Sequence, residues 1–225
     1  SLTSELINYY IHDSSGYLYN ENSNGNLFTH TLQEGEEAYI VDLFDRVDKE
    51  IDLDFKRVAN SEIADIKIFK ADDNAKLLDN SDTVGFTEII NDNNNNSINV
   101  WWRNWVPDLR TNYYTEYSQL SEQESFTIAH ELGHAFGLSH PREQPYAEWL
   151  NSSDTILSYN FDSISGHKAL NFSDADISTL KLLWGEENDN NTSKRTNVKS
   201  GAYEFSESFT SLVKREINDN KKDSE

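Results

Sequence analysis

The chain has 225 residues, with 19 Lys and Arg against 40 Asp and Glu, a net charge of −21, no cysteine and no methionine. This charge argues against nucleic acid or an anionic membrane as a partner, since both are negative. The missing cysteines exclude disulfides, a thiol nucleophile and zinc sites built on thiolates. No apolar run reaches about 18 residues, so we predict no membrane span. Because the chain does not begin with Met, we expect that a preceding segment was removed before Ser1.

Hydrophobic periodicity predicts one helix and three strands in the first half of the chain. Apolar residues recur at helical spacing from Glu36 to Ile51, which predicts an amphipathic helix. Residues 64–69, 84–90 and 97–102 are rich in β-branched and aromatic side chains and are predicted strands. The Asn-rich run 91–96 lacks apolar residues and is predicted to be a surface loop. A helix followed by strands indicates an α+β fold with a mixed sheet.

A second helix is predicted to begin after Ser121. Ser121 and Glu124 fit a capping box, in which the two side chains bond each other's backbone N–H groups. The helix is predicted to run through His134 to about Phe136. Gly137 follows, at a position where a helix end favours a residue that tolerates a positive φ.

A third helix is predicted from Asp174 to Trp184, with Ser173 as its cap and Gly185 as its stop. The composition then becomes polar, so residues 186–225 are predicted to be a C-terminal extension. Apolar residues recur at helical spacing over 205–217, which is compatible with a short docked helix or with a connection to a further segment.

The residues with the clearest chemistry lie at the end of the second predicted helix. His130 and His134 are four residues apart, so they project from one helix face and can hold one Zn²⁺. Glu131 points to the side of this pair and can reach a metal-bound water. Gly137 allows the chain to turn sharply, so that His140 can return to the same metal. Three neutral histidines and a water would form an open catalytic site.

These histidines have two other interpretations. The first is a surface helix that carries them by coincidence, which the specific spacing disfavours. The second is a structural metal site. Structural sites usually have four protein ligands, and no cysteine is present to be the fourth.

The motif resembles that of the metzincin zinc endopeptidases, His-Glu-x-x-His-x-x-Gly-x-x-His, here at 130–140. Pro141 after the third histidine is similar to the serralysin family of secreted bacterial proteases. Residues 154–159 resemble that family's Met-turn, and 176–185 resemble the helix that follows it. The resemblance covers roughly residues 5–185.

The resemblance implies a catalytic domain over residues 1–185. Its upper subdomain, about 1–137, would hold a twisted, mostly parallel sheet with an antiparallel edge strand and two long helices. A smaller, irregular lower subdomain, about 138–185, would hold one helix, with the zinc cleft between the two. An edge strand of this family pairs with extended substrate. Either 84–90 or 97–103 could be that strand.

The implied function is that of a secreted, monomeric zinc endopeptidase that hydrolyses peptide bonds in proteins. His130, His134 and His140 would bind Zn²⁺, and Glu131 would be the general base. Tyr159 would ligate the resting zinc and then stabilise the oxyanion. The expected partners are protein or peptide substrates, with neither nucleic acid nor membrane among them. The charge of −21 is compatible with basic substrates or with a protein inhibitor that has a basic face.

Two departures from the family leave alternatives open. Leu157 stands where the family places its Met, which forms an apolar floor beneath the histidines. Leucine has a similar volume, so we expect the floor to survive at modest cost. The calcium-binding repeats that normally follow the catalytic domain are absent, so calcium dependence is not expected. One alternative is a zinc-stabilised binding protein without turnover, and another is an effector protease with few targets.

The other histidines and the clustered tryptophans receive structural interpretations. The histidines without metal spacing are predicted to be surface or capping residues: His12, His30 and His167. The tryptophans are predicted to pack in a core or an interface rather than form an aromatic surface: Trp101, Trp102 and Trp105.

Overall fold

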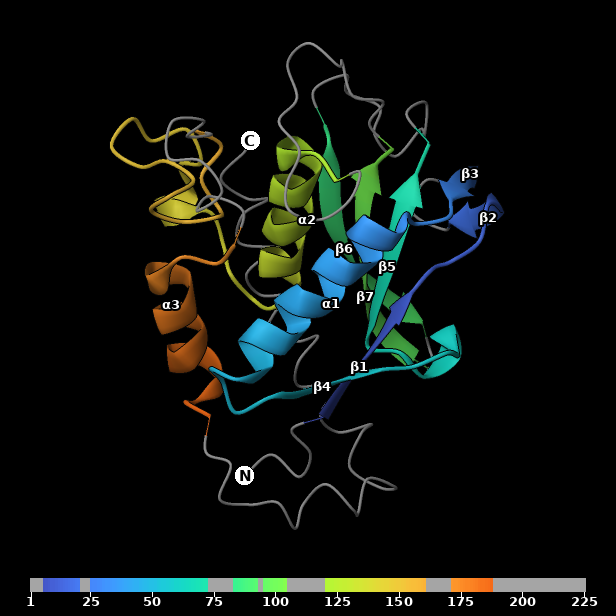
Figure 1. Cartoon of the computed structure of the whole chain (residues 1–225), viewed down its shortest axis with the longest axis horizontal. Helices are drawn as coiled ribbons and strands as arrows, with labels where there is room; N and C mark the ends of the chain where they lie inside the picture. The colour runs from blue at the N-terminus through green and yellow to red at the C-terminus, as the bar shows by residue number, and fades with distance from the viewer. Residues whose placement is uncertain are drawn as a thin grey trace.

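The computed structural model describes residues 6–20, 25–72, 83–92, 95–104, 120–160 and 171–187. Seven strands and three α-helices occur in this part of the chain (Figure 1). The strands are β1 (Leu6–Ile11), β2 (Gly16–Asn20), β3 (Gly25–His30), β4 (Asp54–Arg57), β5 (Ile66–Ala71), β6 (Gly85–Asp92) and β7 (Asn95–Arg103). The helices are α1 (Glu34–Asp48), α2 (Glu122–Ala135) and α3 (Asp174–Trp184). Within these residues, none of the helices has the length and apolar character that a membrane crossing requires.

The strands form one mixed sheet. β4, β1, β5 and β7 are parallel neighbours in that order, and β6 lies antiparallel on the outer side of β7. The predicted α+β class with an antiparallel edge strand is therefore confirmed, and β6 is that strand. The antiparallel hairpin β2–β3, which the sequence analysis did not predict, also pairs with the end of β5. Parallel and antiparallel pairings are thus equally numerous here, so the expectation of a mostly parallel sheet holds only for β4, β1, β5 and β7.

The three helices lie close to where the sequence places them. The predicted helix 36–51 is α1, which begins two residues earlier because Gln33 and Glu36 form a capping box. It ends at Asp48, and Ile51 instead forms an isolated antiparallel bridge with Glu186. The predicted capping box at the start of α2 is present, and Ser173, the predicted cap of α3, forms a capping box with Asp176. Local hydrogen bonding therefore sets these helix starts.

The prediction of a loop over the Asn run 91–96 is wrong at both of its ends. β6 extends to Asp92 and β7 begins at Asn95, with Asn91 opposite Asn96. Antiparallel pairing uses backbone groups, so a polar run can continue a hairpin without apolar side chains.

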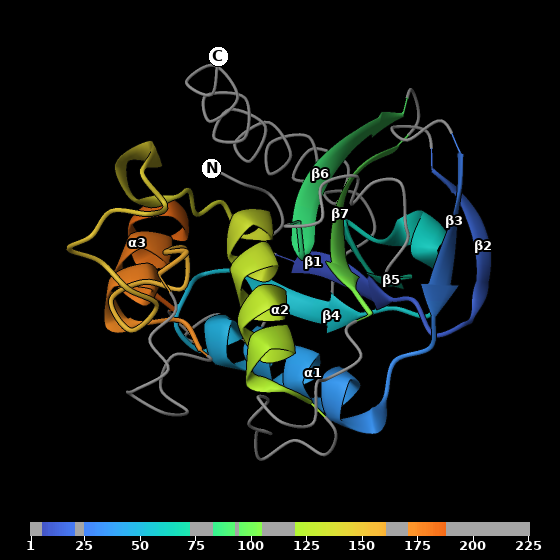
Figure 2. The ribbon, with the colours of Figure 1, turned by 90° about the horizontal axis from the view of Figure 1, so that it is seen from above.

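Two apolar clusters cover the two faces of the sheet. The larger lies between the sheet and helices α1 and α2, and it includes the fully buried Trp102. The smaller lies on the other face beneath the β2–β3 hairpin, where Trp101 stacks on Phe69 with ring centroids 4.3 Å apart. Packing is thus confirmed for Trp101 and Trp102, whereas Trp105 lies outside the described residues. Helix α2 lies between the sheet and α3 (Figures 1 and 2).

A buried ionic cluster connects the starts of α1 and α2 to the central strand. Lys70 of β5 binds the carboxylate of Glu36, and its Nζ lies 3.9 Å from Oε1 of Glu124. All three side chains are almost completely buried. Both carboxylates also belong to capping boxes, so one lysine side chain joins two helix starts.

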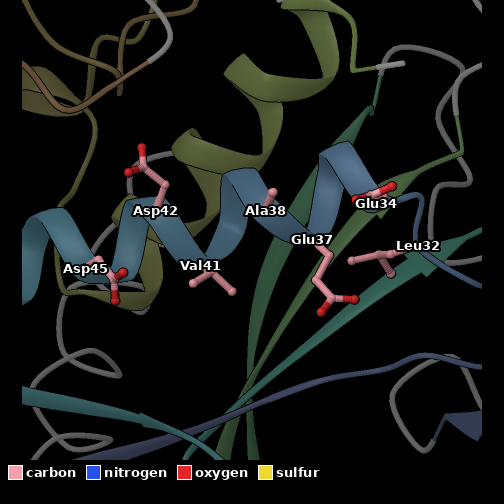
Figure 3. A pocket seen from close by; sticks show the side chains of 7 residues that line it. All are labelled: Leu32, Glu34, Glu37, Ala38, Val41, Asp42 and Asp45. Carbon is pink, nitrogen blue, oxygen red and sulfur yellow. The ribbon is translucent and has the colours of Figure 1, made fainter. Parts of the chain in front are cut away.

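An acidic groove runs along the outer face of α1 (Figure 3). Two of its carboxylates are paired with arginines: Asp42 with Arg46 at 2.6 Å and Glu37 with Arg57 at 2.5 Å. Its lining residues are Leu32, Glu34, Glu37, Ala38, Val41, Asp42 and Asp45. Part of the net negative charge therefore lies on a solvent-exposed face of α1, and the residues that line this groove include no histidine.

Candidate metal centre

Helix α2 and the turn after it bring three histidines together. The rings of His130 and His134 lie on one helix face with centroids 4.8 Å apart. Gly137 ends the helix region with a φ of 97°, a conformation that favours glycine. The chain then returns His140 to the pair, with its ring centroid 4.6 Å from that of His134. The structure thus places the three predicted ligands in one cluster.

The Nε2 atoms of His130 and His140 have the spacing of two ligands of a tetrahedral metal ion, and a nitrogen of His134 lies close to both. One nitrogen from each ring lies within 4.8 Å of the others, and this is the one such group among the described residues. The Nε2 atoms of His130 and His140 are 3.3 Å apart. Two ligands at Zn–N distances of ~2.0–2.1 Å and a tetrahedral angle would lie about 3.3–3.4 Å apart. The donor set can therefore hold a metal ion without a large rearrangement of this pair.

Backbone carbonyls orient two of the rings. His130 donates from Nδ1 to the carbonyl of Ile156 at 2.8 Å, and His134 donates from Nδ1 to Leu138 at 2.9 Å. These bonds leave the Nε2 lone pairs of both rings available for a metal.

The protein environment also keeps the three rings neutral, which is the form that binds a metal. Burial lowers the pKa of His134 to about 4 and that of His140 to about 3. Burial and the neighbouring imidazoles lower the pKa of His130 well below its usual range. At neutral pH the metal-free protein therefore presents three uncharged nitrogen ligands.

Glu131 follows His130 on α2, and its side chain is buried. Burial raises the pKa of its carboxyl to about 8, although a hydrogen bond from Thr87 acts to lower it. A cation at the three imidazoles would favour the ionised form of this carboxylate. Glu131 therefore has the burial and the position next to the ligands that a general base requires.

The turn that resembles a Met-turn is held in place by α3. Asp176 accepts a hydrogen bond from the Thr155 hydroxyl at 2.5 Å and one from the Ile156 N–H at 2.9 Å. The carbonyl of Ile156 in turn orients His130. The sequence analysis missed this supporting role of Asp176, although the residue is visible there as the last position of a capping box that begins at Ser173.

Leu157 is buried in the same turn and packs against α2. A Cβ atom placed on Gly133 would lie 3.0 Å from Cδ2 of Leu157, so glycine allows a close approach of turn and helix. Leu157→Met conserves volume, and we expect it to change the free energy of unfolding by less than about 1.5 kcal/mol. Urea unfolding and a zinc titration would check this prediction. Loss of metal affinity in Leu157→Met would show that the metal centre requires leucine at this position.

Tyr159 lies at the rim of the histidine cluster and is 41% exposed. Its ring centroid is 4.8 Å from that of His140 and 5.3 Å from that of His130. Burial, the charge of Glu131 and the phenol of Tyr146 raise the pKa of Tyr159 to about 12, so its hydroxyl stays protonated at neutral pH. The exposed Tyr146, which the sequence analysis did not select, packs edge-on against Tyr159 with centroids 5.0 Å apart.

Among the described residues, the other two histidines, His12 and His30, do not join the cluster. His30 is half-buried and pairs with Asp72 at 3.2 Å. His12 was predicted to be a surface or capping residue, but it does not lie at the surface: it is buried, and its Nε2 lies 3.1 Å from the hydroxyl of Thr29. The β2–β3 hairpin, which the sequence analysis missed, brings Thr29 to this position. His167 lies outside the described residues.

Comparisons with known proteins add little to this geometry. No family model matches the chain, and no curated protein matches it. One similar chain belongs to a solved structure described as "GM1 bound form of the ECX AB5 holotoxin". It has a TM-score of 0.42 and 15% sequence identity, and the match covers 85% of each chain. A similarity with this TM-score carries no argument about function.

Proposed function

We propose that this protein is a zinc-dependent endopeptidase of the metzincin type, most similar to the serralysin family. The observation that carries the proposal is the convergence of three neutral imidazoles beside a buried carboxylate. His130, His134 and His140 supply three nitrogens, and Glu131 supplies the carboxylate. Three nitrogen ligands leave a position free, which is typical of catalytic rather than structural zinc sites.

The residues of the site divide the chemistry of peptide hydrolysis between them. Zinc held by the histidines would lower the pKa of a water and polarise the peptide carbonyl. Glu131 accepts a proton from the attacking water and returns it to the leaving amine. Tyr159 donates a hydrogen bond to the oxyanion that develops on the carbonyl oxygen. The outer edge of β6 pairs with the extended substrate.

Secretion, a monomeric state and control by a protein inhibitor belong to the same proposal, because all three follow from the family resemblance. The acidic surface would favour basic substrates or an inhibitor with a basic face. Cleavage rates of matched acidic and basic peptides at low and high salt would test this preference.

The direct test is incubation of the zinc-loaded protein with a denatured protein and with a broad peptide library. We expect fragments that disappear when a chelator is added and return when zinc is restored. Zinc-loaded protein that cleaved neither substrate would contradict the proposal and favour a zinc-stabilised binding protein. Cleavage of only a few peptides would favour the narrow effector protease.

Tyr159→Phe removes the phenolic donor and keeps the ring. We expect kcat/KM to fall roughly 10²-fold, because loss of one oxyanion donor has an effect of that order. The zinc content should not change, since the three imidazoles remain. Tyr17→Phe is the matched control, because Tyr17 is 74% exposed on β2. Full peptidase activity in Tyr159→Phe would remove this residue from the mechanism.

A further inference from the structure

Thr87 of the edge strand holds the carboxylate of Glu131. Its Oγ1 donates toward the backbone carbonyl of Glu131 at 2.8 Å and toward the carboxylate Oε2 at 3.0 Å. The hydroxyl therefore contacts both the main chain and the reactive end of the same residue. A carboxylate that accepts a hydrogen bond from a fixed donor is restricted in orientation.

Gly85, two residues earlier on β6, allows the strand to come this close to α2. A Cβ atom on Gly85 would lie 2.7 Å from Cγ2 of Thr127 and 2.8 Å from Cγ of Glu131. Both distances are far shorter than van der Waals contact, so any side chain at this position would displace the strand or Glu131. The close approach of β6 to Glu131 thus depends on the absence of a side chain at Gly85 and on the hydroxyl of Thr87.

The backbone of the same two residues faces the open edge of the sheet. Residues opposite each other in an antiparallel pair alternate between hydrogen-bonded and non-hydrogen-bonded pairs. Arg103 donates to the carbonyl of Val84 at 2.9 Å, so Val84 and Arg103 form a hydrogen-bonded pair. The register then makes Gly85 and Thr87 members of non-hydrogen-bonded pairs. Their N–H and C=O groups point away from β7, and in the described residues no strand lies on that side of β6.

We propose that Thr87 is a positioning residue that couples substrate pairing at the edge of β6 to the orientation of the Glu131 carboxylate. This inference rests on the proposed peptidase function. An extended peptide that adds to β6 would bond the outward backbone groups of Gly85 and Thr87. That pairing fixes the backbone of Thr87, and its hydroxyl then fixes the base. The base is thus held in place by the strand that receives the substrate.

The test compares Thr87→Val, which replaces the hydroxyl with a methyl group, and Thr87→Ser, which retains it. Thr179→Val is the matched control, because Thr179 is exposed on α3 and its hydroxyl bonds only the carbonyl of Ala175 among the described contacts. Each protein is loaded with zinc, and its zinc content, thermal midpoint, kcat and KM for one peptide are measured. We expect Thr87→Val to keep its zinc and to lose kcat by roughly 10- to 100-fold, which corresponds to a hydrogen bond with a charged group. Thr87→Ser should recover kcat to within about threefold of the parent protein.

The outcomes separate this inference from the proposed function. An active parent protein whose Thr87→Val variant keeps full kcat would overturn the inference and leave the peptidase in place. A Thr87→Ser variant as impaired as Thr87→Val would also overturn it, because the hydroxyl would then not be the cause. If the parent protein is inactive, the proposed function fails. A crystal structure of zinc-loaded Thr87→Val then decides: an unmoved Glu131 carboxylate overturns the inference, and a displaced one supports the positioning role.

Discussion

Glu131→Gln is expected to lower kcat/KM by about 10²- to 10⁴-fold while the protein keeps its fold and its zinc. Glutamine has the same shape as glutamate, and its amide oxygen can still accept the hydrogen bond from Thr87. It cannot take a proton from the attacking water. The loss of activity would therefore report proton transfer rather than packing.

The environment of Glu131 explains why the loss should be large. The side chain is buried on the helix that carries His130 and His134, and burial raises the pKa of the carboxyl to about 8. A bound zinc ion would lower this pKa toward the working pH, and a base with a pKa in that range transfers protons in both directions, as hydrolysis requires.

The measurement is the steady-state cleavage of one peptide by parent and variant proteins with equal zinc content. Glu122→Gln, on the first turn of the same helix, is the matched control and should retain activity within about twofold. Unchanged kcat/KM in Glu131→Gln would show that another group is the base. Loss of zinc in this variant would show that Glu131 acts on metal binding instead.

Lys70→Met is expected to lower the free energy of unfolding by about 3–5 kcal/mol, which is the usual cost of removing one partner from a buried ionic group. Methionine fills most of the volume of the lysine stem but leaves Glu36 and Glu124 buried without their cation. Burial already raises the pKa of Glu124, and the charge of Lys70 opposes that rise. Without Lys70 the pKa of Glu124 would therefore rise further.

The sign of the pH dependence follows from that rise. A carboxyl whose pKa is higher in the folded state than in the unfolded state destabilises the fold at pH values above both, and acid relieves the penalty. The loss in the free energy of unfolding of Lys70→Met should therefore be largest at alkaline pH and smaller near pH 5. Urea unfolding of parent and variant across this pH range measures it.

A double variant provides the control for packing. Lys70→Met combined with Glu36→Gln removes one of the buried charges and should recover part of the lost stability. A single variant that is destabilised by less than about 1 kcal/mol at every pH would contradict the account of the buried cluster. Equal losses in the single and double variants would assign the effect to the volume of the lysine side chain.

Features of the fold that depend on neighbouring residues could be predicted from the sequence. The spacing of His130 and His134, the turn at Gly137 and the caps of α2 and α3 all involve contacts within a few residues. Helical geometry alone places such groups on one face or at one end. The sequence alone therefore predicts the three candidate ligands.

Features that depend on distant residues could not be predicted in this way. Thr87 and Glu131 are 44 residues apart in sequence, and Asp176 lies 20 residues from the Ile156 N–H that it binds. Lys70 meets Glu36 only because β5 and α1 pack together. Such contacts follow from the sheet order and the packing of helices on it, which periodicity does not specify.

Three features of the composition can be related to parts of the structure. The absence of cysteine leaves an all-nitrogen set of three histidines. The chain has no methionine, and the buried Leu157 lies in the turn whose Ile156 carbonyl orients His130. The charge of −21 is partly accounted for by the solvated face of α1 (Figure 3).

The most direct test of an open three-histidine zinc centre is X-ray absorption spectroscopy at the zinc edge on protein loaded with one equivalent of metal. The prediction is three nitrogen ligands at about 2.0–2.1 Å, together with at least one oxygen ligand from a water molecule. His140→Ala should lose one of the nitrogens and most of the affinity. A failure to bind stoichiometric zinc, or a closed site with four nitrogen ligands from the protein, would contradict the proposed metal centre.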